Sequence, residues 1–194
     1  RLFQAWCVWL CRPHFNQQQQ QQSRQRFQTI AKEMELALQR EEGPWLDHKA
    51  NLNKSITPGS ADVIFIPYVE RMNASLAYYK GFNLRSEHPL INDWLSTLEE
   101  SDVYRGSQSD FHTHSHDLPP QMGGCWTESN PTQKKLSADI DLGKGCGKFE
   151  NHLSDDLDIT ATSLSTDNSA QTGAETMLFG VFYALGDSTE LSLS

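Results

Sequence analysis

The chain has 194 residues, of which 37% are hydrophobic, and a net charge of −9. This length suits one ordinary domain with a tail rather than several domains. Eight of the 25 acidic residues, but no Lys or Arg, follow Lys148, so the preceding part is close to neutral. A nucleic-acid-binding body needs a basic face to neutralise phosphates, and this distribution excludes one. The acidic end is expected to be solvated or to face a partner.

The chain opens at Arg1, without a methionine, inside an apolar pattern, which indicates a processed product or part of a longer protein. Its apolar residues recur at a spacing near 3.6 and predict a helix that ends before Pro13. These residues are Leu2, Phe3, Trp6, Trp9 and Leu10. The longest apolar run here, Ala5–Leu10, is too short to span a bilayer, so we expect neither a signal peptide nor a transmembrane segment.

The four cysteines, Cys7, Cys11, Cys125 and Cys146, form no CxxC pair. Cys7 and Cys11 are four residues apart, and side chains at this spacing share one face of a helix. We interpret them as small buried hydrophobic residues of a protein in a reducing compartment.

A second helix follows the glutamine run Gln17–Gln22, which we expect to be its solvent-exposed first turn or a loop. The helix itself is predicted by apolar residues at helical spacing, namely Phe27, Ile30, Ala31, Met34 and Leu38. Gly43 and Pro44 end it, and the polar segment Asp47–Pro58 predicts a long connecting loop.

The third helix is predicted to begin with Gly59 as N-cap and Asp62 in the first turn, where the helix dipole favours a carboxylate. Its apolar residues wrap more than one face, which predicts the buried centre of a bundle. They include Val63, Ile66, Val69, Leu76 and Tyr79. Gly81 ends the helix.

The fourth helix is predicted to begin at His88-Pro89, with proline at the first helical position. Amphipathic spacing then continues through Leu90, Ile91, Trp94, Leu95 and Leu98. Four helices joined by loops make an all-α bundle.

After Gly123-Gly124 the apolar period is lost, and the chain becomes rich in Ser, Thr, Asp, Asn and Gly. We therefore expect a helical domain over residues 1–126 and a long, mostly irregular acidic tail over residues 127–194. The apolar segment 177–185 is the exception, and we expect it to dock on the body or on another protein.

Several segments resemble the C-terminal helical domain of the glutathione S-transferase superfamily, and most of all its cyanobacterial and plastid branch. They are Gly59-Ser60-Ala61-Asp62, Pro67-Tyr68-Val69-Glu70-Arg71, His88-Pro89, Trp94 and the stretch from Gln108 to Cys125. The resemblance spans about Arg1 to Trp126 and implies that family's helical bundle. In the family the third helix opens with a Ser/Thr-x-x-Asp capping box, whereas here Gly59 takes the first place. The family's catalytic and glutathione-binding residues lie in a thioredoxin-like domain, for which this sequence shows no βαβ pattern.

A histidine-rich segment carries the sharpest chemical hypothesis. His112, His114 and His116 alternate with small polar residues, and in an extended chain this spacing places three imidazoles on one side. Three histidines with a carboxylate or water suit zinc or a similar metal. The alternative is that they hold an irregular, proline-rich loop over the bundle by hydrogen bonds, which the resemblance favours.

Two functions follow from this sequence. The first is a non-catalytic, transferase-like helical domain that serves as a protein-binding or assembly subunit, in concrete form an accessory subunit of a plastid photosynthetic membrane complex. Its partners would be other protein subunits, which it would contact through the Trp-rich first helix and the acidic tail. It would associate peripherally with the membrane complex and need no cofactor. We expect it in the plastid or the cytoplasm. The alternative is the acceptor-substrate half of a glutathione-dependent transferase, with a hydrophobic pocket formed by Trp6, Trp9, Leu10 and Tyr68. Glutathione would be a cofactor only if a thioredoxin-like domain exists upstream.

Overall fold

The computed structural model describes residues 1–144. These residues belong to one compact unit. The described residues form nine helices and no strand, which confirms the predicted all-α class. The helices are α1 Leu2–Cys11, α2 Gln17–Arg40, α3 His48–Leu52, α4 Ser60–Lys80, α5 Leu84–Glu87, α6 Pro89–Glu99, α7 Asp102–Ser107, α8 Phe111–Met122 and α9 Pro131–Asp141.

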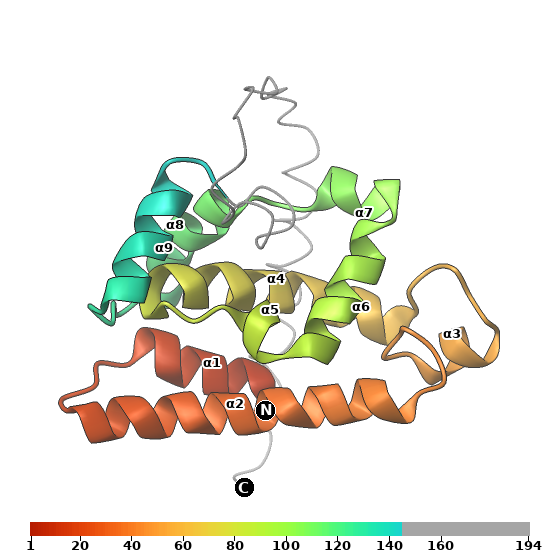
Figure 1. The fold of residues 1–194 in the computed structure, drawn as a ribbon, viewed down its shortest axis with the longest axis horizontal. Coiled ribbons are helices and arrows are strands. Elements are labelled where there is room, and N and C mark those ends of the chain that lie inside the picture. Colours follow the sequence, from red (N-terminus) through yellow and green to blue (C-terminus); the bar gives the residue numbers. More distant parts are fainter. Residues whose placement is uncertain (145–194) are drawn as a thin grey trace, which may run out of the picture. The chain divides into compact units, whose positions relative to one another are not determined.

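Helices α1 and α2 lie side by side, as Figure 1 shows, and the apolar faces that their spacing predicted meet in the core. The centre of this contact is aromatic: the ring centroids of Trp9 and Phe27 are 5.5 Å apart, and those of Trp9 and Phe82 are 5.2 Å apart. The glutamine run forms the mostly exposed first turns of α2, which Asn16 caps by accepting from the Gln19 amide. Both helices therefore begin and end close to where the sequence predicts.

Helix α4 is the central element and packs against α1, α5, α8 and α9. From Val69 to Lys80 every residue is buried except Glu70 and Tyr78, which are partly exposed, as expected for a central helix. Its first turns differ from the prediction, because Val63 is 58% exposed and its neighbours Ile64 and Phe65 are exposed as well. No described helix covers the exposed side of these turns, whereas Asp62 on their buried side accepts from Trp94 of α6. α3 and its connecting loops project from the body beside this end of α4 (Figure 1).

Three short helices lie in segments for which the sequence predicted only loops. α3 falls inside the expected connection Asp47–Pro58, and α5 and α7 flank α6. The first two begin where a side chain satisfies free amides: Asp47 accepts from Lys49 and Ala50, and Asn83 accepts from Arg85 and Ser86. Such single turns depend on their caps and on packing more than on an apolar period.

Two longer helices also correct the sequence-based expectations. The histidine-rich segment is helical in α8, capped by the Asp110 carboxylate on the Thr113 amide at 2.7 Å, and is not extended. Residues 131–141, expected to be irregular, form α9, with Asn130 as N-cap and Pro131 in the first turn. Leu136 and Ile140 anchor α9 in an apolar cluster with α4. Residues 145–194 of the expected tail, including the segment 177–185, lie outside the described residues.

The end of α4 approaches α9 closely at Gly81. This residue has φ 64°, in the left-handed region, and caps the helix with its amide on the Ala77 carbonyl. A Cβ atom at this position would lie 2.5 Å from the Gln133 backbone nitrogen, far inside van der Waals contact. Gln133 also donates from Nε2 to the Tyr78 carbonyl at 2.8 Å. Glycine is thus required here both by the backbone conformation and by the neighbouring helix.

Candidate functional site

Three of the four residues of the predicted hydrophobic pocket are core residues. Trp6, Trp9 and Leu10 are at most 1% exposed and fill the core between α1, α2 and α4. Their polar groups are also used internally, because Trp6 Nε1 donates to Ser75 Oγ at 3.0 Å. Tyr68 is half-buried, with its ring edge against Phe3 at 5.5 Å. The tryptophan rings of α1 therefore face the core and are not available on the surface, unlike the partner-contacting, Trp-rich helix that the sequence led us to expect.

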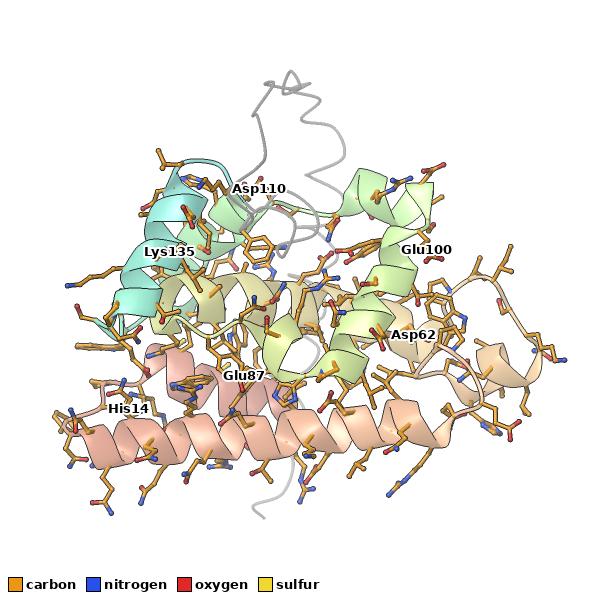
Figure 2. The ribbon with its side chains drawn as sticks, in the orientation of Figure 1. His14, Asp62, Glu87, Glu100, Asp110 and Lys135 are labelled. Atoms are coloured by element: carbon orange, nitrogen blue, oxygen red, sulfur yellow. The ribbon has the colours of Figure 1, made fainter. Side chains whose placement is uncertain are left out.

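The predicted capping pair has a wider role than starting α4. The Asp62 carboxylate accepts from the Gly59 amide at 3.0 Å, the arrangement of a capping box. It is completely buried and also accepts from the backbone amides of Leu46 and Asp47 and from Trp94 Nε1. Asp62, labelled in Figure 2, thereby joins α4 to α6 and to the connection before α3. The first-turn position indicated the cap, but nothing in the sequence indicated the other three donors.

The helical conformation of α8 separates the three histidines. His114 is 8% exposed and turns into the interior, where its Nε2 lies 3.8 Å from Glu70 Oε2. The same glutamate accepts a short hydrogen bond from the Tyr104 hydroxyl. His114 thus belongs to a buried polar network between α4, α7 and α8, and cannot join the other two histidines around one metal ion.

His112 and His116 stay together because they are four residues apart on one helix. Their ring centroids are 4.2 Å apart, and both side chains are exposed. The Asp141 carboxylate at the end of α9 completes the group, with Oδ1 3.0 Å from His116 Nε2. The structure therefore keeps two of the three predicted metal ligands and adds a carboxylate from a segment that was expected to be irregular.

A second feature is an exposed apolar edge next to the start of α4. We call it the α3–α4 edge and define it by Leu52, Ile56, Val63, Ile64 and Phe65. The exposed fractions are 69% for Leu52 and 94% for Ile56, both before α4, and 61% for Ile64 within it. The charged side chains exposed in the segment that carries Leu52 and Ile56 are basic, Lys49 and Lys54. The edge is therefore apolar with a basic border.

Three of the cysteines form a group in which Cys11 and Cys125 also interact with the buried Lys80. Cys7, Cys11 and Cys125 are each partly exposed, rather than the fully buried hydrophobic residues that the sequence suggested for Cys7 and Cys11. A hydrogen bond from the Cys125 side chain lowers the pKa of Cys11, and the Lys80 ammonium lowers it further, while burial acts in the opposite direction. Burial, together with the Cys11 thiol, raises the pKa of Cys7 to about 12. The two thiols of α1 should therefore differ strongly in reactivity.

We expect iodoacetamide to label Cys11 well before Cys7 at neutral pH, because the thiolate is the reacting form and only Cys11 has a lowered pKa. Peptide mapping by mass spectrometry at a series of pH values gives a rate profile for each cysteine. Cys125→Ala should move the Cys11 profile to higher pH, whereas Cys125→Ser keeps a hydroxyl donor and should move it less. Equal labelling of Cys7 and Cys11 at neutral pH would contradict this assignment.

No helix among residues 1–144 combines the length and apolar character needed to cross a bilayer. In comparisons with known proteins, the chain matches no family model, no curated protein and no solved structure.

Proposed function

We propose that this chain is a helical protein-binding or assembly subunit that docks a partner on the α3–α4 edge. The observation that carries the proposal is the exposure of Val63, Ile64 and Phe65 at 58%, 61% and 41%. Large apolar side chains grouped in this way on a surface usually mark an interaction site. Burying one such side chain against a partner contributes about 1.5–3 kcal/mol.

The contrast along α4 supports this proposal. Beyond Val69 the helix is buried on nearly all sides, whereas its first turns keep apolar residues without a described helix above them. Asp62 sits inside the same turns and holds them by four hydrogen bonds, so the exposed residues are presented on a fixed backbone. A surface that is preorganised in this way loses little entropy when a partner binds.

The partner that fits is a protein subunit with an apolar helix face bordered by acidic residues. The apolar face would cover Val63, Ile64 and Phe65, and the acidic border would meet Lys49 and Lys54, which are exposed. Complementary charges of this kind accelerate association and select the partner more than they add affinity.

The proposal includes the fold of the glutathione S-transferase C-terminal domain. It is supported by the all-helical structure, by the Gly59 and Asp62 cap of α4, and by the start of α6 at Pro89 after His88. The sequence resemblance to the plastid branch further suggests a plastid location and a role as an accessory subunit, with peripheral association, in a photosynthetic membrane complex. Glutathione chemistry is not part of the proposal, because Trp6, Trp9 and Leu10, three of the four residues expected to hold an acceptor substrate, are buried in the core.

The test is retention of a defined partner from a plastid membrane extract by the immobilised full chain. Ile64→Asp should reduce the retained amount about tenfold or more, because it places a charge at the centre of the apolar contact. Val103→Asp is the matched control, since Val103 is 85% exposed on α7, outside the α3–α4 edge. Raising the salt concentration should slow association by screening Lys49 and Lys54. Equal retention of the same proteins by all three chains would rule out this docking site.

A further inference from the structure

The group formed by His112, His116 and Asp141 has the composition and spacing of a metal site. One ligand atom from each residue can be chosen so that all of them lie within 4.8 Å of one another. Among residues 1–144, this is the only such group of three or more His, Cys, Asp or Glu side chains. It joins α8 to α9, since His116 and Asp141 are 25 residues apart along the chain.

The distances require only small side-chain rotations to close around an ion. Zinc binds imidazole nitrogen and carboxylate oxygen at about 2.0–2.2 Å, so ligand atoms around a tetrahedral ion are about 3.3 Å apart. His116 Nε2 and Asp141 Oδ1 are already 3.0 Å apart, and the two imidazole rings lie 4.2 Å apart between centroids. An ion would replace the direct contact between His116 and Asp141 with two bonds to the metal.

Tyr78 supports this arrangement from α4. Its hydroxyl donates to Asp141 Oδ2 at 3.2 Å, which leaves Oδ1 directed at His116. Its ring also packs edge-on against the His116 ring at 5.1 Å between centroids. Outer contacts of this kind fix the orientation of metal ligands and contribute to affinity.

We propose that His112, His116 and Asp141 bind one divalent transition-metal ion of the zinc type. The two imidazoles favour zinc, cobalt or nickel over magnesium and calcium, which prefer oxygen ligands. Three protein ligands leave a fourth position for water or for a donor from another molecule. The bound ion fastens α9 to α8 and so holds the segment that leads into the acidic tail. This inference does not depend on the α3–α4 edge.

The experiment is calorimetric titration of the full chain with Zn²⁺ after dialysis against a chelator. We expect one equivalent to bind, and no binding of Mg²⁺ under the same conditions. His116→Ala and Asp141→Asn should each weaken the site at least tenfold, the usual effect of losing one ligand or its support. The matched control is His48→Ala, because His48 is also exposed and also contacts a carboxylate, Glu41 at 2.8 Å, but is not part of the group.

Two further measurements separate this site from binding by thiols. Co²⁺ bound by nitrogen and oxygen ligands should give visible absorption without the intense near-ultraviolet band of cobalt–thiolate bonds. Affinity should also fall as the pH is lowered from about 8 to about 5.5, because imidazole binds metal only when unprotonated. Circular dichroism of each variant checks that it is folded. Unchanged Zn²⁺ affinity in folded His116→Ala and Asp141→Asn chains, or a thiolate band that survives in both, would overturn the proposal.

Discussion

Replacing Asp62 by alanine should lower the free energy of unfolding by about 4 kcal/mol, because four donors lose a buried charged acceptor. Two of them, the Leu46 amide at 2.7 Å and Trp94 Nε1 at 2.8 Å, lie in other parts of the fold, and the bond from Trp94 is buried. A typical domain has only about 5–15 kcal/mol of stability, so this single change should remove a large part of it. Urea denaturation followed by circular dichroism measures the loss.

The control for this prediction is Asp93→Ala. Asp93 is also an aspartate near the start of a helix, but its side chain is exposed on α6. Its removal should change the unfolding free energy by less than about 0.5 kcal/mol. Asp62→Asn should fall between the two, because one amide oxygen can still accept while the new NH₂ group faces the remaining donors. A loss below about 1 kcal/mol for Asp62→Ala would show that these hydrogen bonds do not hold α4, α6 and the α3 connection together.

The second large effect is expected at the buried ion pair between α5 and α6. Arg85 donates to both carboxylate oxygens of Glu99, at 2.7 and 3.0 Å, and both side chains are 2% exposed. Arg85→Met should therefore cost about 3–5 kcal/mol, because it leaves the Glu99 charge buried without its cation. Thermal and urea unfolding of the purified chain measure this loss.

A double variant distinguishes the cost of breaking the pair from its net contribution. Replacing both partners, as Arg85→Met with Glu99→Leu, should restore most of the stability, since two apolar side chains leave no buried charge behind. The exposed pair of Arg105 and Asp102 on α7 is the control, and Arg105→Met should cost less than about 0.5 kcal/mol. If the double variant is as unstable as Arg85→Met, the loss comes from packing or from the further hydrogen bonds to Asn92, Ser96 and Gln108, rather than from the uncompensated charge.

The longer helices α1, α2, α4 and α6 could be predicted because proline and glycine residues mark where they begin or end. Pro13 stops α1, Gly43 follows α2, Gly81 ends α4, and Pro89 begins α6. Between these limits, enough apolar residues repeat at helical spacing to indicate a helix even where a single residue departs from the pattern. The all-α class follows from these elements alone.

The elements that were missed depend on contacts between distant segments. α9 has few large apolar residues, and its anchors, Leu136 and Ile140, have meaning only against the face of α4. α8 contains Pro119 and Pro120 near its end, and its histidines alternate with small polar residues. Neither feature is typical of a helix, so the sequence did not predict one here. The N-cap of α8 is Asp110, but a capping residue without an apolar period does not predict a helix.

The same limit applies to the candidate metal group. The spacing of His112 and His116 suits one helix face as well as one side of a strand, and the sequence does not decide between them. Only the helix excludes His114 from the group. Asp141 could not be predicted at all, because it reaches His116 only through the docking of α9 on α4.

The residue at position 81 also determines whether α9 can dock on α4. Because a Cβ atom there would meet the backbone of Gln133 at 2.5 Å, one added methyl group acts as a wedge between α4 and α9. Asp141 sits on the same helix as Gln133, so the wedge would carry the carboxylate away from His116 without altering any proposed ligand. The integrity of the His112, His116 and Asp141 group is therefore encoded partly at position 81, and a relative with those three residues but another residue there would need a different way to hold α9.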